Sequence, residues 1–383
     1  MPFDRAQGVR VAVFTDANLD STSGVTTTLN ALVTHAPREL QPRIYTFSDL
    51  EVDAPHHRAM RGSLVNRYRK TRAELLRDGV DAVHMTTPGP SGLLARHLAG
   101  ELGLPLVGSL HERVGTSRTS LRSQFLRWIY GRCRQMLLPS EDLARRLTAC
   151  AWFPRPAAVW PRGVDVRTFS PAHRSDHMRD EWHVSHRRPA ILVAGRVSAE
   201  KGLGVLEPIS SLLHRQRIAH RLIVMGSGPM LATLHERCPD ALFTGQLAAS
   251  EVPLVMASAD VLLYPSEGSS GCSVLLEGQA SGLPVVVANV GSARESMLPG
   301  RSGFVCRAGD VEDFAVRLGL LLVDRERRRV MGEAARTYAS ARSWERSLAT
   351  VCAAYREARN TTPQQDRAAP LTTFPQQRSA GQQ

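Results

Sequence analysis

The chain has 383 residues, of which 43% are hydrophobic and 22% are charged, a globular composition whose length favours two domains. The formal net charge is +12 and Lys occurs only at Lys70 and Lys201, so Arg carries nearly all of the positive charge, and a surface this basic favours anionic partners. No apolar run approaches the roughly eighteen residues that cross a bilayer, and the N-terminus shows no signal-peptide pattern, which argues against an integral membrane protein and against export.

The six cysteines are scattered along the chain and form no CxxC pair. Without an export signal, such cysteines are expected to be reduced thiols. We therefore expect a cytoplasmic protein that has neither a disulfide framework nor a metal site.

Short apolar strands alternate with segments of helical period along the whole chain. We predict strands at 9–14, 42–47, 81–85, 105–110 and 157–160, and again at 190–195, 221–226, 241–245, 260–264 and 284–288. Strands this apolar, separated by helices, are typical of parallel sheets that are buried on both faces. The sequence therefore predicts an α/β protein with two doubly wound, Rossmann-like domains.

A polar, turn-rich segment, "PRGVDVRTFSPAHRSDHMRDEWHVSHRRP", separates the two series of strands. We place the domain boundary there, with a first domain at 1–165 and a second at 166–340. A last helix at 341–359 carries an apolar face that has to pack against another element. The remaining residues, 360–383, are rich in Pro, Gln, Thr and Ser and are expected to be disordered.

Two doubly wound domains imply a cleft, and ligands of such sheets bind beyond the carboxyl ends of the strands. In "ILVAGRVSAEKGLGVL", Arg196 follows a strand directly and Lys201 stands just before a helix. Two cations beside a helix N-terminus suit a pyrophosphate. A solvated turn with a salt bridge through Glu200 is an equally good interpretation of this stretch.

Two further strands of the second half end in glycine-containing turns. Gly226 lies in "VMGSGPM" and Gly245 in "FTGQL". Both glycines are candidate ligand-binding residues, and the turn at Gly245 could offer backbone groups to a flat base, but ordinary strand-to-helix turns have the same composition.

The stretch "YPSEGSSGCSVLLEGQASGLPVVV" runs from a strand through a Gly/Ser loop into a helix that we expect to begin near Ser273. The first N–H groups of that helix, at Ser273, Val274 and Leu275, have no partner within the helix and suit an anion. Glu277 lies one turn further, where its carboxylate can accept two hydrogen bonds from a vicinal diol such as a ribose. An ordinary surface glutamate is the alternative.

The first half offers two weaker candidates at strand ends. Gly24, in "DSTSGVTTTLNAL", precedes a helix and lies where a phosphate would approach the backbone. His111 follows the strand "PLVGSL" and is expected to point into the cleft. A lone histidine is more often structural than catalytic, so both interpretations of His111 stay open.

Taken together, these stretches resemble retaining glycosyltransferases of the GT-B fold, in particular glycosyltransferase family 4. The similarity runs from about Val9 to Tyr355. The matching stretches stand in family order: "DSTSGVTTTLNAL", "DAVHMTTPGPSGLLA", "PLVGSLH", "LLPSEDLARRL", "PRGVDVRTFSP", "VAGRVSAEKGL", "LIVMGSGPM", "FTGQL", "ADVLLYPSE", "VLLEGQASGLPVV" and "GRSGFV".

The resemblance implies a donor diphosphate site. Arg196 and Lys201 would hold the diphosphate, and the backbone amides of Val274 and Leu275 would complete the site. Gly24 matches the glycine whose backbone approaches the phosphate in the family. The resemblance also implies that the last helix crosses back and docks on the first domain.

The resemblance further implies a sugar and ribose site. Glu277 matches the second glutamate of the E-x7-E motif, which binds the donor ribose, and His111 matches the histidine that faces the donor sugar. The chain departs from the motif at its first glutamate, since that position is Ser269 and the nearest acid is Glu267. Which of the two takes the role stays open, and with it the identity of the hexose.

The function that the resemblance implies is transfer of a hexose, of mannose or glucose type, to a hydroxyl of a lipid or polysaccharide. The donor would be of the GDP-mannose or UDP-glucose type, the anomeric configuration would be retained, and neither a metal nor a cofactor would take part. A sugar-nucleotide epimerase of the same fold and a catalytically silent nucleotide-sugar-binding protein are the alternatives. We expect no nucleic-acid partner, because the motifs lie at strand ends and no basic–aromatic module of a known type is present.

Two basic stretches in the first domain raise the question of a membrane partner. They are "HHRAMRGSLVNRYRKTRAELLRDG" and "RVGTSRTSLRSQFLRWIYGRCRQ", and the second mixes Arg with Phe125, Leu126, Trp128, Ile129 and Tyr130. A basic helix with aromatic residues is typical of contact with an anionic membrane surface, here the inner face. The alternative is that these apolar residues belong to the core and the Arg residues to a solvated face.

Overall fold

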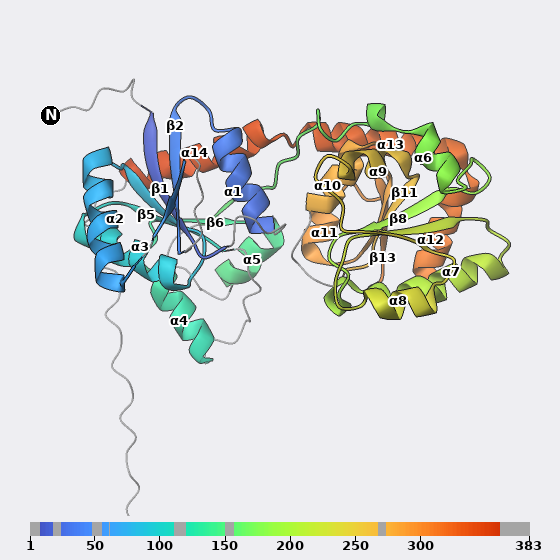
Figure 1. Cartoon of the computed structure of the whole chain (residues 1–383), viewed down its shortest axis with the longest axis horizontal. Helices are drawn as coiled ribbons and strands as arrows, with labels where there is room; N and C mark the ends of the chain where they lie inside the picture. The colour runs from blue at the N-terminus through green and yellow to red at the C-terminus, as the bar shows by residue number, and fades with distance from the viewer. Residues whose placement is uncertain are drawn as a thin grey trace, which may run out of the picture.

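The computed structural model describes residues 8–17, 24–47, 56–60, 62–110, 120–149, 157–266 and 273–360. Two α/β units lie side by side, the first in blue to teal and the second in green to orange (Figure 1). Each is built on one sheet, and every strand pair in both sheets is parallel. The predicted fold of two doubly wound, Rossmann-like sheets is confirmed.

The first sheet has the strand order β3-β2-β1-β4-β5-β6-β7. Its strands are β1 (Val9–Thr15), β2 (Leu40–Thr46), β3 (His57–Ala59), β4 (Ala82–Met85), β5 (Leu106–Ser109), β6 (Gln135–Leu138) and β7 (Ala157–Val159). The helices that follow them are α1 (Gly24–Thr34), α2 (Leu64–Asp78), α3 (Pro90–Glu101), α4 (Leu121–Tyr130) and α5 (Glu141–Ala149).

The second sheet has the order β10-β9-β8-β11-β12-β13. Its strands are β8 (Ala190–Ala194), β9 (Arg221–Met225), β10 (Leu242–Gly245), β11 (Val261–Tyr264), β12 (Val285–Ala288) and β13 (Gly303–Cys306). Its helices are α6 (Asp176–Glu181), α7 (Leu206–Arg215), α8 (Leu231–Arg237), α9 (Val252–Ser258), α10 (Ser273–Ala280), α11 (Gly291–Glu295), α12 (Val311–Val323) and α13 (Arg325–Ser340). Three short 3₁₀ turns, at Pro171–His173, Ala199–Lys201 and Leu203–Val205, complete the unit.

Three strands, β3, β6 and β13, go beyond the ten that the sequence predicts. β3 is a three-residue polar edge strand with the sequence "HRA", which carries no apolar signal. β6 ("QMLL") and β13 ("GFVC") are four residues long, as are β4, β5 and β11, which the sequence does predict, so length alone does not explain their omission.

Both sheets are buried on both faces, as their apolar strands require. Along β1, Val11 and Val13 pack into one core cluster while Ala12 and Phe14 pack into another on the opposite face. This alternation follows from the period of two along a strand. Helices α2, α3 and α4 supply residues to the cluster that contains Phe14.

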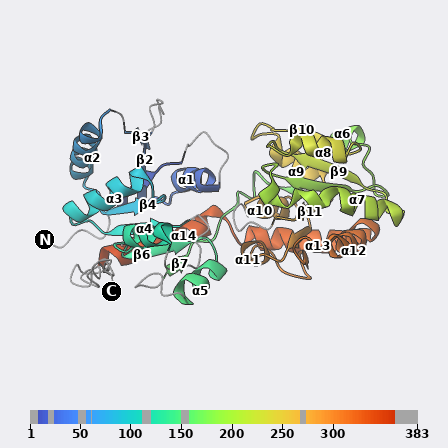
Figure 2. The same cartoon turned by 90° about the horizontal axis from the view of Figure 1, so that it is seen from below.

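The last helix, α14 (Trp344–Asn360), returns to the first sheet and packs in the cluster that contains Val11 and Val13. Its buried face contributes Leu348, Val351 and Tyr355. Figure 2 shows α14 beside β6 and β7, while α13 stays with the second unit. The chain therefore passes between the units twice, before α6 and before α14.

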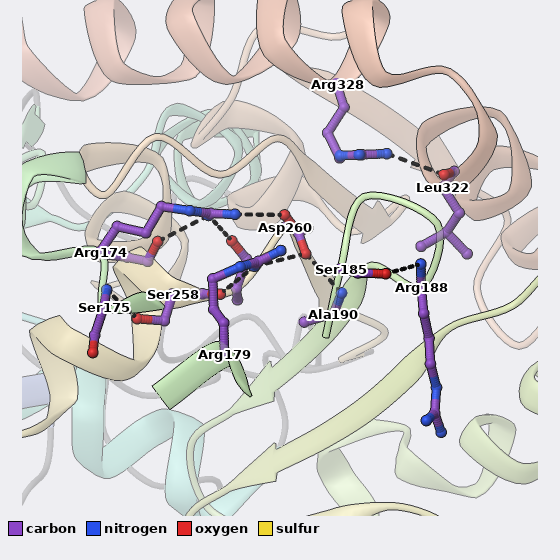
Figure 3. A network of polar contacts seen from close by, with 12 residues as sticks. Arg174, Ser175, Arg179, Ser185, Arg188, Ala190, Ser258, Asp260, Leu322 and Arg328 are labelled. Carbon is purple, nitrogen blue, oxygen red and sulfur yellow. Dashed lines mark hydrogen bonds and ion pairs between the residues drawn. The ribbon is translucent and has the colours of Figure 1, made fainter. Parts of the chain in front are cut away.

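A buried ion network lies at the amino ends of β8 and β11 (Figure 3). The carboxylate of Asp260 lies 3.0 Å from Arg179 Nη1 and 3.2 Å from Arg174 Nη2, and it accepts a hydrogen bond of 2.8 Å from the backbone N–H of Ala190. Asp260 and Arg179 are both buried, so each charge depends on the other. This network joins the amino ends of β8 and β11 and so stabilises the edge of the sheet opposite to the carboxyl ends of its strands.

Candidate functional site

The second sheet has a pocket where its strand order reverses, between β8 and β11. The lining residues come from the carboxyl ends of β8, β9 and β11 and include Gly195, Arg196, Lys201, Tyr264, Pro265 and Ser266. In doubly wound sheets, this switch point is where ligands bind. The sequence-based expectation that Arg196 and Lys201 lie together at such an edge agrees with this geometry.

The two cations of the pocket differ in exposure. Arg196 is exposed, and no acidic side chain in the described residues pairs with it. Lys201 is half-buried, with its Nζ 5.7 Å from the centroid of the Tyr264 ring. Glu200 forms no ion pair within the described residues, and its carboxylate accepts a hydrogen bond of 3.4 Å from Ser198 Oγ instead. The alternative of a salt-bridged turn through Glu200 is therefore not what this segment forms.

Glycines bring the strand ends close together beside these cations. A Cβ on Gly226 would lie 2.0 Å from the carbonyl oxygen of Gly195, and Gly226 has a φ of +134°. Close approach of β9 to β8 thus accounts for this glycine. Gly245 has a φ of +68° at the end of β10, a Cβ at this position would meet no other atom within 4 Å, and its carbonyl oxygen accepts a hydrogen bond of 2.9 Å from the N–H of Gly226.

Helix α10 begins at Ser273, where the sequence predicts it, and runs for eight residues beside the pocket. Its second residue, Val274, approaches Gly195, while Leu275 is fully buried. Ser273 Oγ accepts a hydrogen bond of 3.1 Å from Arg162 Nη1. The start of α10 and the end of β8 therefore border the same space.

Glu277 lies on α10 one turn from Ser273 and is half-buried. Burial raises the pKa of the Glu277 carboxyl to about 7, while the positive charge of Arg162 acts in the opposite direction. A carboxyl that titrates near neutrality and sits next to a candidate ligand pocket is typical of a functional site.

Arg162 is a residue that the sequence did not single out. It lies between β7 and α6, and its Nη1 donates to Thr28 Oγ1 on α1 at 3.5 Å as well as to Ser273 Oγ on α10. These partners lie more than a hundred positions apart in the chain. No local sequence pattern predicts a functional role for Arg162, because the polar, turn-rich stretch "PRGVDVRTFSP" is typical of a linker.

The first unit contributes α1, which begins at Gly24 and faces the second unit through Thr28. The sequence also missed Asp16, which follows β1 at the switch point of the first sheet. Its carboxylate accepts hydrogen bonds of 2.6 Å from Thr87 Oγ1 and 2.8 Å from the N–H of Ser91, so it caps α3, whose N-cap residue, Gly89, has no side chain to do so.

His111, Glu267 and Ser269 lie outside the described residues. Their predicted roles toward the donor sugar stay predictions. Arg196, Lys201, Ser273 and Glu277, in contrast, lie around one region at the carboxyl edge of the second sheet.

The two units also touch through α5 and α11. Glu295, the last residue of α11, accepts hydrogen bonds of 3.0 and 2.7 Å from the N–H groups of Glu141 and Asp142 at the start of α5. Arg145 Nη2 lies 3.5 Å from the same carboxylate. A side chain of the second unit thus caps a helix of the first.

Comparisons with known families cover nearly the whole of the described chain. The profile described as "Glycosyltransferase Family 4" matches residues 5–168, and the profile described as "Glycosyl transferases group 1" matches residues 175–338. No helix in the described residues is both long and apolar enough to span a membrane.

Two curated proteins and one solved structure illustrate the similarity. A sulfoquinovosyl transferase, SQD2, of Arabidopsis thaliana is 32% identical, over 71% of this chain and 56% of its own length. A GDP-mannose-dependent alpha-mannosyltransferase of Mycolicibacterium smegmatis is 31% identical, over 69% of this chain and 70% of its own length. The crystal structure of a glycosyltransferase from Rickettsia africae superposes with a TM-score of 0.76 at 16% identity, covering 93% of this chain and 100% of that one.

Proposed function

The chain belongs to glycosyltransferase family 4, the group 1 glycosyltransferases, and from this premise we propose that it moves a hexose of mannose or glucose type from a nucleotide diphosphate sugar to a hydroxyl of a lipid, with retention of the anomeric configuration. The observation that carries the proposal is the exposed guanidinium of Arg196, which pairs with no acidic side chain of the described residues and lies beside Lys201 at the switch-point pocket. The two units and their parallel sheets are those of a GT-B glycosyltransferase.

The chemical demand of this reaction is the departure of the nucleoside diphosphate. Negative charge grows on the diphosphate as its bond to the anomeric carbon breaks. In the proposal, Arg196, Lys201 and the first N–H groups of α10 stabilise that charge, and no metal takes part. Removal of one such preorganised contact lowers turnover by about a hundredfold or more.

The donor's nucleoside has a proposed partner in Glu277. An ionised carboxylate accepts a hydrogen bond from each hydroxyl of a ribose diol, and Glu277 lies one turn into the helix whose start would bind the phosphates. GDP-mannose is the first donor to test, because a relative at 31% identity is named for it, and UDP-glucose is the second.

The proposal is tested by a thermal-shift screen of purified protein against GDP-mannose, UDP-glucose and UDP-N-acetylglucosamine. One of them should stabilise the wild type and should fail to stabilise Arg196→Ala. The matched control is Arg187→Ala, since Arg187 is an exposed arginine before the amino end of β8, at the opposite edge of the sheet. Equal stabilisation of all three proteins would contradict the assignment of Arg196.

The lipid acceptor is proposed because of the outer face of α4. Leu121, Phe125 and Trp128 are 85%, 40% and 41% exposed, and their spacing places them on one side of the helix. Arg122 and Arg127 lie on the same helix. An apolar stripe flanked by guanidinium groups fits an anionic bilayer, in which the apolar side chains enter the headgroup region and the cations pair with phosphates.

The sequence of α4 allowed two interpretations, membrane contact and core packing, and each applies to some of its apolar residues. Leu126, Ile129 and Tyr130 are buried in the first core cluster, while Phe125 and Trp128 remain at the surface. Arg96 of α3 stacks over the Trp128 ring at 4.4 Å, which keeps the indole in place. A polysaccharide is the acceptor that remains if this surface does not bind lipid.

A further inference from the structure

Arg162 lies in the first of the two segments that connect the units, and hydrogen bonds to the second segment hold its backbone in place. Trp160 Nε1 donates to Ser347 Oγ at 3.0 Å, and that hydroxyl donates to the carbonyl oxygen of Pro161 at 2.6 Å. On the other side, the N–H of Val164 donates to the carbonyl oxygen of Arg342 at 3.0 Å. The residues on both sides of Arg162 are therefore fixed to the start of α14.

The neighbouring glycine shows how closely the two crossings pack. A Cβ on Gly163 would lie 2.6 Å from the indole of Trp344, and Trp344 itself is buried. The backbone of Arg162 thus has a defined position between the two units.

Among the described residues, the guanidinium of Arg162 contacts a hydroxyl group in each unit. Its Nη1 donates to Thr28 Oγ1 of α1 and to Ser273 Oγ of α10. Both acceptors are neutral hydroxyls, and a phosphate oxygen is a stronger partner for a guanidinium because the hydrogen bond is then charge-assisted and can be bidentate. Arg162 is also the cation whose charge acts on Glu277.

From this placement we propose that Arg162 is a third cation of the donor site, which binds the donor diphosphate at the start of α10 while it stays in contact with α1. The inference rests on the proposed function, since it needs a diphosphate at that helix. It adds a group that comes from neither the segment of Arg196 nor helix α10, and it makes donor binding depend on the relative position of the two units.

The test compares binding of a nucleoside diphosphate with binding of the bare nucleoside. The probes are GDP and UDP by isothermal titration, and guanosine and uridine by saturation-transfer NMR because nucleosides bind weakly. Arg162→Gln should bind the diphosphate about ten- to a hundredfold more weakly than wild type, the loss expected for one charged hydrogen bond, with unchanged nucleoside binding. Arg162→Lys keeps the positive charge but cannot donate two parallel hydrogen bonds, so its affinity for the diphosphate should fall by less.

The matched control is Arg167→Gln, an exposed arginine five residues further along the same crossing segment, which should bind as wild type does. Diphosphate binding by Arg162→Gln at wild-type strength would overturn the inference and leave the proposed function standing. Equal weakening of diphosphate and nucleoside would also overturn it, because it would mean a structural role. Absence of GDP and UDP binding to the wild type itself would overturn the proposed function together with the inference.

Discussion

At the scale of single residues, Glu277 combines a half-buried position on α10 with a pKa raised to about 7. In an unfolded chain the pKa of the same carboxyl is near its ordinary value of 4.5. The folded protein therefore binds a proton more tightly than the unfolded chain does. The stability that results is present below pH 4.5 and is lost as the pH rises through about 7.

The first prediction concerns ligand binding at this carboxyl. Because a ribose diol donates to the ionised form, affinity for GDP or UDP should rise between pH 5.5 and 8, with a midpoint near 7. Glu277→Gln should not show this rise in affinity. Dividing the affinity of the wild type by that of Glu277→Gln at each pH cancels the effect of the ligand's own phosphate titration. Parallel pH profiles for wild type and Glu277→Gln would show that Glu277 does not bind the ribose.

The same variant tests the linkage in the free protein. Relative to Glu277→Gln, the wild type should lose thermal stability as the pH rises from 4.5 to 7. Arg162 is the charged residue that opposes this shift, so Arg162→Gln should move the midpoint to higher pH. A constant difference in melting temperature across this range would contradict the raised pKa.

Some residues of the candidate site can be predicted from the sequence, and others cannot. Arg196 and Lys201 were found because they follow a strand and precede a helix within six positions. Arg162 was not found, since its contacts with Thr28 and Ser273 depend on how three distant segments meet. Asp16 was missed for a similar reason, because its partner Thr87 lies in the loop that follows β4, the neighbouring strand of the sheet, and is far from Asp16 in the chain.

At the scale of elements, α4 shows that composition alone does not separate a core face from a surface face. The stretch holds five apolar residues within six positions, and the helix turns Leu126, Ile129 and Tyr130 inward while it leaves Phe125 and Trp128 outside. The strands were easier to predict, because runs such as "AILVA" at β8 are apolar along their whole length. Of the strands that the sequence does not predict, β3 is a polar edge strand of three residues, while β6 and β13 are as long as several predicted strands.

The prediction at this scale is that α4 binds anionic membranes. Wild-type protein should sediment with vesicles of phosphatidylglycerol and phosphatidylcholine at low salt, and much less with phosphatidylcholine alone. Phe125→Ser with Trp128→Ser should reduce the bound fraction several-fold, since both apolar anchors are removed.

Leu320→Ser with Val323→Ser is the control, because these residues are exposed apolar positions on α12 of the second unit. If the α4 variant sediments as the wild type does, the surface is not a membrane contact. A polysaccharide then becomes the acceptor to test.

At the scale of the whole molecule, three kinds of contact join the two units among the described residues. The paired crossings at 160–164 and 341–347 form a hinge of fixed backbone, Arg162 connects α1 with α10, and Glu295 connects α11 with α5. The last two contacts lie on side chains, so they can break and re-form while the hinge stays intact.

The prediction at this scale concerns Glu295 as an interdomain helix cap. Glu295→Ala should increase amide hydrogen exchange in the first turn of α5 by about fivefold, because a lost cap costs about 1 kcal/mol. Hydrogen exchange with mass spectrometry of peptides that contain residues 141–145 measures this. Glu236→Ala, at an exposed glutamate of α8, is the control, and unchanged exchange in α5 would mean that the contact contributes nothing in solution.

Our central proposal is that Arg196, at the switch-point pocket, stabilises the leaving diphosphate while a hexose is transferred from a nucleotide diphosphate sugar. The most direct measurement is the release of GDP from GDP-mannose, and of UDP from UDP-glucose, by wild type and Arg196→Ala on addition of an anionic lipid extract. The account predicts lipid-dependent release with one of the two donors and a loss of about a hundredfold in Arg196→Ala. Release at the same rate by both proteins, or donor binding by the wild type without any release across lipid and polysaccharide acceptors, would contradict it.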